Sequence, residues 1–143
     1  MSESINETPV YPELQDFEID VFNELTEVMD TVVPQGNFRS EAEPVLEDFP
    51  VCVFYRDDSF PDWRRESTSD FEDYTIETYR ATAYALSMDE CRKIMNVLSE
   101  RLRQMNFRRL SMRPVPNLAD NRIKRIEARF EIKFDNTGQM YRT

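Results

Sequence analysis

The spacing of apolar residues along the chain predicts two helices. Over residues 13–33, apolar side chains recur at helical spacing and would share one face of a helix; they are Leu14, Phe17, Val21, Leu25, Val28 and Val32. Pro34 ends this helix and Gly36 turns the chain. A second helix is expected from Ser87, because Ser87 and Glu90 stand at capping-box spacing. Its apolar stripe, typical of a core face, comprises Cys91, Ile94, Met95, Leu98, Leu102 and Met105.

Strands are expected between and after these helices. Residues 49–55 are apolar, β-branched and aromatic, which is typical of a short strand buried on both faces. Residues 74–86 predict a longer strand whose inner face carries small alanines, which leaves room for a helix to pack closely. Residues 107–112 predict a third strand. Residues 122–134 alternate apolar and charged positions strictly, as in a sheet with one face on a core. A turn follows, and residues 139–142 suit a short returning edge strand.

These elements predict an α+β fold: a mostly antiparallel β-sheet with two helices packed on one face, in the order α-β-β-α-β-β. Residues 1–12 are expected to be a flexible acidic N-terminus, and residues 13–143 a single α+β domain. Residues 56–73 are polar and predict a long loop or a mobile hairpin tip, a kind of segment that is usually functional or disordered. Residues 113–121 contain two prolines and predict a turn.

The charge is divided between the two parts of the chain. Residues 1–90 carry 23 Asp and Glu against 5 Lys and Arg, a net of 5 − 23 = −18. Residues 91–143 carry 13 basic and 5 acidic residues, a net of 13 − 5 = +8, and the sum is the total of −10. Such a chain can be complementary to a second copy of itself, in a heterologous contact that closes into a ring or continues as a filament. The alternative is that the two parts neutralise each other within one monomer.

Several classes of function are disfavoured by what the sequence lacks. It contains no His, which removes the commonest general base, the common catalytic triads and the commonest metal ligand. Gly36 and Gly138 are the only glycines, so no glycine-rich phosphate loop can form. We therefore expect no enzymatic activity and no catalytic, cofactor-binding or metal-binding residues. We also expect no membrane segment, since no apolar run is long enough, and the acidic N-terminus is no secretory signal.

Two groups of residues are candidates for chemistry, each with a simpler interpretation. Asp57, Asp58 and Asp62 would suit a hard cation, but the calcium-loop spacing is missing and a solvated acidic loop is favoured. Cys52 is a candidate nucleophile without a His partner, so inert burial is favoured. Cys52 and Cys91 both stand among apolar residues, as expected for small buried thiols in a reducing compartment.

The candidate interface residues begin with Trp63, which Arg64 and Arg65 follow in the predicted loop. A Trp beside Arg has the composition of an interaction hot spot, and a Trp that covers the core from the loop is the alternative.

Two further sets of charged residues are candidates for contact with a partner. The basic cluster of the third strand contains Arg108, Arg109 and Arg113. It would contact either nucleic acid or the acidic residues of a neighbouring subunit, and the overall acidity disfavours nucleic acid. The solvent-facing positions of the last long strand alternate in sign, at Arg125, Glu127, Arg129 and Glu131. This ladder is either a soluble face or a surface for lateral pairing with another subunit.

Parts of the chain resemble a known family over roughly residues 45–143. The shorter matching pieces are Phe49-Pro50-x-Val, Tyr79-Arg-Ala-Thr-Ala-Tyr84 and Cys91-Arg-Lys-Ile94. The longer ones are Met105-Asn-Phe107-Arg-Arg, Pro116-Asn117-Leu118-x-Asp120 and Ile123-x-Arg125-Ile126-x-Ala128-Arg129-Phe130. Together they resemble the small tail-completion proteins of tailed bacteriophages known as tail terminators. The acidic first helix and residues 56–73 depart from that pattern.

The resemblance implies a structural virion protein with a β-sheet flanked by helices. It would form a homo-oligomeric ring, typically a hexamer, that caps the last tail-tube ring, stops tube growth and joins the tail to the neck of the head. The implied partners are other copies of the chain, the tail-tube protein and a neck or head-completion protein, with DNA only passing through the ring lumen. The implied location is the virion tail and neck, and the host cytoplasm during assembly. A head-closure or neck protein is the nearest alternative, followed by an acidic monomeric regulator of a basic partner.

Overall fold

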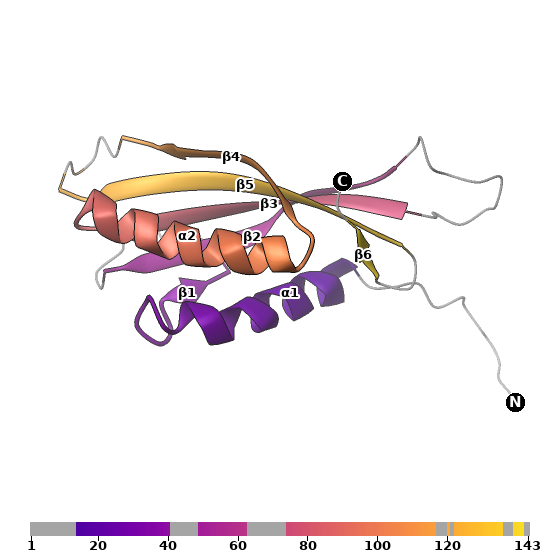
Figure 1. The fold of residues 1–143 in the computed structure, drawn as a ribbon, viewed down its shortest axis with the longest axis horizontal. Coiled ribbons are helices and arrows are strands. Elements are labelled where there is room, and N and C mark those ends of the chain that lie inside the picture. The colour runs from indigo at the N-terminus through magenta and orange to yellow at the C-terminus, as the bar shows by residue number, and fades with distance from the viewer. Residues whose placement is uncertain are drawn as a thin grey trace, which may run out of the picture.

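The computed structural model describes residues 14–40, 49–62, 74–116, 120, 122–135 and 139–141. Within these residues the chain forms two helices and six strands (Figure 1). In chain order they are α1 (Leu14–Met29), β1 (Phe38–Arg39), β2 (Val51–Pro61), β3 (Tyr74–Ala85), α2 (Met88–Gln104), β4 (Arg108–Pro114), β5 (Lys124–Asp135) and β6 (Met140–Tyr141).

The strands form one mixed sheet in the order β1-β2-β3-β5-β4, and β6 pairs with β5 beside this path. β1 runs parallel to β2, and the other pairs are antiparallel. The α+β class predicted from the sequence is confirmed, but the order differs from α-β-β-α-β-β. β1 is an additional short strand, and β6 is the short returning strand expected within residues 139–142. A two-residue strand is too short to leave a periodic pattern, so the parallel pairing of β1 could not be anticipated.

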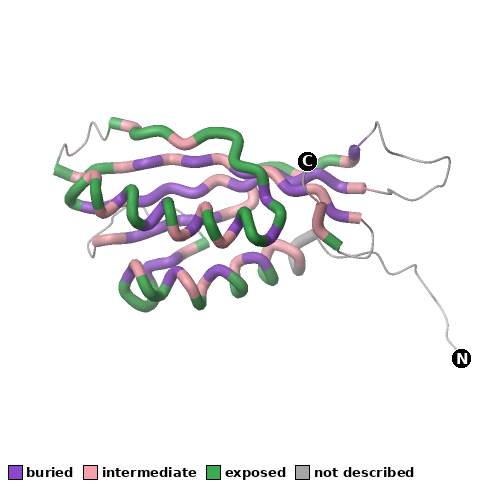
Figure 2. The backbone as a smooth tube through the Cα atoms, viewed as in Figure 1, coloured by how far each residue is buried: buried purple, intermediate pink, exposed green. Residues whose placement is uncertain are grey.

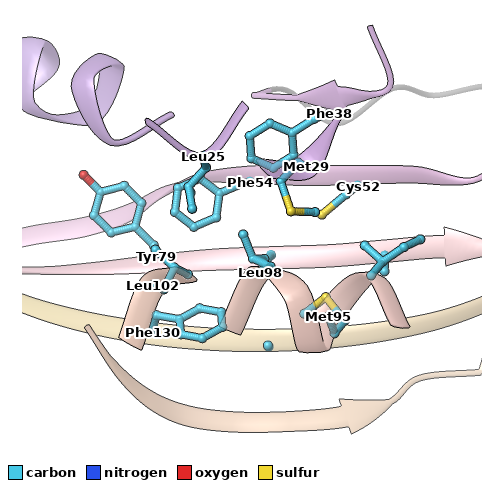
Figure 3. Packing of buried hydrophobic residues seen from close by; sticks show 14 of the residues in the cluster. Leu25, Met29, Phe38, Cys52, Phe54, Tyr79, Met95, Leu98, Leu102 and Phe130 are labelled. Carbon is cyan, nitrogen blue, oxygen red and sulfur yellow. The ribbon is translucent and has the colours of Figure 1, made fainter. Parts of the chain in front are cut away.

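Both helices lie on the same side of the sheet (Figure 1). α2 packs against β3, β5 and β4, and α1 packs beside α2 and against β2. The predicted stripe of α2, from Cys91 to Met105, is buried. It faces the alanines of β3 at Ala81, Ala83 and Ala85, as expected. Figure 3 shows how Leu25 and Met29 of α1 join the same cluster as Leu98 and Leu102 of α2.

The two ends of α2 are fixed by local hydrogen bonds. Ser87 is the N-cap, and its hydroxyl accepts from the Glu90 amide at 3.2 Å, which confirms the predicted helix start. At the other end, the amide of Phe107 donates to the Leu102 carbonyl and that of Asn106 to the Arg103 carbonyl. This is a Schellman motif, with Asn106 in the left-handed region at φ 74°. The motif directs the chain from α2 into β4.

The prediction for residues 56–73 is wrong for its first part. β2 extends to Pro61, and residues 56 and 58–61 pair with β3 despite their polar character. The register shifts between Arg56 and Asp58, which marks a β-bulge. Backbone pairing with β3 maintains this strand where it extends past the helices, so hydrophobic periodicity could not reveal it. Residues 63–73 lie outside the described residues, as do residues 1–13.

The backbone conformation of Asn106 gives the first prediction. Asn106→Ala should lower the free energy of unfolding by about 1 kcal/mol, because a Cβ-bearing residue other than Asn or Asp is disfavoured in the left-handed region. Asn106→Gly should remain close to the wild type. Both variants lose the hydrogen bond from Asn106 Nδ2 to the Met140 carbonyl, which is 3.3 Å long. The difference between their free energies of unfolding therefore reports the cost of the left-handed backbone conformation. Urea unfolding measures it, and equal losses in both variants would contradict the assignment.

Candidate interaction surfaces

The outer face of α1 is an acidic surface. The helix contains no basic residue in its last turn. Its carboxylates Asp20, Glu24 and Glu27 are exposed, and Figure 2 shows exposed and buried positions alternating along α1. Glu24 pairs with Arg101 of α2, which links the two helices. Asp20 and Glu27 make no ion pair within the described part of the chain. We call these three carboxylates the acidic edge.

β4 is a basic strand at the opposite edge of the sheet from β1. Six of its seven residues are exposed, and three of those are Arg108, Arg109 and Arg113 (Figure 2). These predicted interface residues therefore share one accessible edge. Figure 1 places this strand and α1 on opposite margins of the molecule. The division of charge seen in the sequence thus becomes a separation in space.

The face of the sheet away from the helices carries a network of ion pairs. Arg80 of β3 lies 3.2 Å from Glu127 of β5 and 3.4 Å from Asp57 of β2. Arg129 lies 3.8 Å from Asp57, and Arg113 lies 3.9 Å from Glu127. The network therefore joins four neighbouring strands. On this face the acidic and basic parts of the chain do neutralise each other, as the monomer interpretation of the charge division expects.

The predicted charge ladder of β5 lies on this face. Glu127 and Arg129 take part in the network, whereas the Arg125 guanidinium donates to the Pro116 carbonyl at 3.1 Å. Glu131 makes no ion pair among the residues that the structure describes. β5 is hydrogen-bonded to β3 on one side and to β4 on the other. Strand-to-strand pairing of β5 with another subunit is therefore ruled out, and the ladder can meet a partner only through its face.

Of the remaining candidate residues, the structure describes the aspartates but not the tryptophan and its neighbouring arginines. Trp63, Arg64 and Arg65 lie outside the described residues, and their interface role stays a prediction. Asp57 is paired with arginines, and Asp62 is buried and lies 4.0 Å from Lys133. A solvated acidic loop is therefore wrong for Asp62.

No grouping of three or more metal-ligating side chains occurs in the described ranges. Nor is either described helix long and apolar enough to cross a membrane.

The two thiols are buried and free, as expected. Burial raises the pKa of Cys52 to about 12, with a smaller contribution from Cys91. Burial also raises the pKa of Cys91, whose thiol lies 3.3 Å from the Lys124 carbonyl. Because the thiolate is the reactive form, both groups are poor nucleophiles at neutral pH. The inert interpretation is thus the one that their surroundings support.

A buried carboxylate, Glu77, was missed in the sequence. It is fully buried on the helix side of β3. Its oxygens accept from the Tyr79 hydroxyl at 2.8 Å and the Ser59 hydroxyl at 3.0 Å, and Arg56 lies 3.6 Å away. Arg56 also pairs with Glu18 of α1 at 3.7 Å. The cluster therefore attaches the first half of α1 to the sheet. Glu77 stands two residues before Tyr79, so the period of two residues places it on the same inward face of β3 as Tyr79 and the alanines. This spacing is the sequence signal that indicates its burial.

The environment of Glu77 shifts its ionisation. Burial raises the pKa of Glu77, and the hydrogen bond from Tyr79 and the charge of Arg56 oppose this only in part. Burial likewise raises the pKa of Tyr79, and the neighbouring Glu77 carboxylate adds to the effect. Both pKa values are thus shifted toward the protonated form, and the contact between Tyr79 and Glu77 is a hydrogen bond within the buried cluster.

Comparison with known proteins does not place the chain in a family. It matches no known family model, and no curated protein sequence is significantly similar to it.

The buried carboxylate gives a prediction about pH. Because the folded chain holds the Glu77 proton at pH values where the unfolded chain has lost it, the free energy of unfolding falls as pH rises through that interval. Glu77→Gln cannot ionise and should lack this loss. Urea unfolding at acidic and neutral pH should therefore find the wild type losing stability relative to Glu77→Gln as pH rises.

Tyr79→Phe is the companion variant for this measurement. It keeps the carboxyl group but removes a donor that lowers the pKa of Glu77. Its stability should fall more steeply with pH than that of the wild type. Parallel pH profiles for the wild type and Glu77→Gln would contradict the assignment.

Proposed function

We propose that this chain is a structural assembly protein that forms a ring of identical subunits, and that it acts as a tail terminator in a tailed bacteriophage. One observation carries the proposal: unpaired carboxylates and unpaired guanidiniums occupy opposite margins of the molecule. Asp20 and Glu27 represent the first set and Arg108 and Arg109 the second, each without an ion-pair partner in the described residues. If all acidic and basic residues paired within one monomer, neither these carboxylates nor these guanidiniums would remain unpaired.

The geometry of such a contact favours a ring. When the acidic margin of one copy meets the basic margin of the next, the contact is heterologous and leaves one margin free at each end. Further copies add until the rotation between neighbours closes the ring or extends it as a filament. A ring requires no catalytic group, and the sequence lacks the His and the glycine-rich loop that common enzyme sites use. The proposed role is therefore not enzymatic.

The assignment to a tail terminator rests on the resemblance of residues 45–143. The ring would cap the last ring of the tail tube, stop its growth and join the tail to the neck or head-completion protein. Its place would be the tail and neck of the virion, and the host cytoplasm during assembly. Within this role Trp63, with Arg64 and Arg65, is a proposed contact to the tube or the neck. The β5 ladder is a proposed contact to the acidic part of a neighbouring copy. A head-closure or neck protein would use the same ring architecture.

An acidic monomeric regulator is the second candidate, because the acidic edge would suit a basic partner. The two candidates differ in self-association. A regulator stays monomeric in low salt, whereas a terminator forms a ring alone or on the tube.

The proposal is tested by negative-stain imaging of the purified chain, alone and mixed with the tail-tube protein of the same virus. We expect rings, or tubes of arrested length that carry the chain at one end. Tubes of unrestrained length with no bound chain would reject the terminator role. If the chain alone also gave only monomeric particles, the regulator would be favoured.

A further inference from the structure

A groove of about 500 Å³ lies between α2 and the beginning of β4. Its polar wall on α2 includes Glu100 and Arg103, and Arg108 and Arg109 of β4 also line it. Phe107 contributes to its lining and is itself buried in the core. The Schellman motif at the end of α2 turns the chain into β4, which forms the other side of the groove. We call this feature the basic groove.

Two of its three guanidiniums lack an anionic partner. The Arg103 guanidinium is bound by Glu100, with Nε 3.2 Å and Nη2 2.6 Å from the two carboxylate oxygens. Arg108 and Arg109 have no carboxylate within ion-pair distance in the described part of the chain. Arg109 makes only a weak contact, 3.8 Å from its Nη1 to the Met112 sulfur. At the β4 side of the groove, two guanidiniums without an ion-pair partner among the described residues are therefore available to a partner.

The form of β4 indicates what kind of partner fits. Arginine side chains, the register shift between Arg109 and Ser111, and Pro114 at its end all discourage another strand from pairing with this edge. A partner would thus be held by its side chains rather than by a ladder of backbone hydrogen bonds. A helix that presents carboxylates meets this requirement.

The chain itself contains such a helix. Asp20, Glu24 and Glu27 of the acidic edge follow one another at intervals of four and three residues, which places them on one side of α1. The stripe spans about 10 Å along the helix axis. Within one molecule these carboxylates cannot reach the basic groove, because α1 and β4 lie on opposite margins (Figure 1). A second copy has no such restriction.

We infer that the acidic edge of one copy docks into the basic groove of the next copy, with Asp20 and Glu27 pairing with Arg108 and Arg109. This inference rests on the proposed function, in which copies associate head to tail. It names the contact through which they do so. The pair Glu100–Arg103 lines the same groove and limits its positive charge to the two β4 residues that the neighbour neutralises.

Charge reversal tests the contact in the full-length chain. Asp20→Lys with Glu27→Lys reverses the acidic edge, and Arg108→Glu with Arg109→Glu reverses the groove. Each double variant should weaken self-association by at least about tenfold in sedimentation velocity at low salt, since like charges then face each other. The chain that carries all four substitutions should recover, because the contact is restored with opposite sign. An equimolar mixture of the two double variants should recover as well.

Control variants separate this contact from a general effect of charge. Lys93→Glu changes an exposed residue of α2 outside the groove, and Asp58→Lys changes an exposed residue of β2. Both should associate as the wild type does, and circular dichroism should confirm that every variant is folded. Raising the salt from about 0.02 M to about 0.5 M should weaken the wild type and leave the reversed double variants little changed.

Three results would overturn the inference. The first is a wild-type chain that stays monomeric up to its solubility limit in low salt and on the tube. The second is self-association that survives either double reversal. The third concerns the double variant Arg108→Glu with Arg109→Glu. If this variant lost binding to a labelled DNA duplex but kept its self-association, the groove would bind nucleic acid instead.

The outcome for the contact is separable from that for the function. Tubes that are still capped by the reversed variants would reject the contact and leave the terminator role intact. Recovery of self-association by the fourfold variant, with no capping of tubes by the wild type, would support the contact and reject the terminator role.

Discussion

The packing of α2 onto small residues of the central strands is the constraint on which the rest of the structure depends. Ala81 of β3 and Ala128 of β5 stand directly opposite each other, and both are fully buried beneath the helix layer. Their small side chains leave room above the sheet for the leucines and methionines of α2. α1 then packs beside α2, and β4 departs from its end. A larger residue at either alanine would displace α2 and with it both charged margins of the molecule.

The two interpretations of the divided charge apply to different parts of the surface. On the uncovered face of the sheet, Arg80 and its neighbours form a network in which opposite charges are already paired. Such partly exposed pairs each contribute little to stability, but within the network the opposite charges neutralise each other. At the margins the pairing among the described residues is incomplete, and the charges that they leave free are acidic on α1 and basic on β4. Neutralisation within the monomer and complementarity between copies are therefore compatible.

The buried cluster around Glu77 gives the acidic margin a fixed position. Removing a carboxylate from water is unfavourable unless hydrogen bonds and a counter-charge compensate. Tyr79, Ser59 and Arg56 supply part of that compensation, and Arg56 also pairs with Glu18 on α1. The same arginine amide donates to Glu18 at 2.9 Å, so both the backbone and the side chain of residue 56 hold the helix. The acidic edge is thus anchored by a polar contact as well as by its apolar face.

The sequence by itself determined the two helices, the places of the four long strands and many of the apolar residues that face the core. These features follow local rules, namely the periods of 3.6 and 2 residues and the capping signal at Ser87. Only the tertiary structure decided that β2 continues through polar residues and that β1 joins the sheet in parallel. The tertiary structure also decided that β5, the strand that carries the charge ladder, has a strand on either side of it. It also decided that the acidic and basic residues are separated by the width of the molecule. Strand order and spatial charge depend on pairing between distant segments, which local periodicity does not encode.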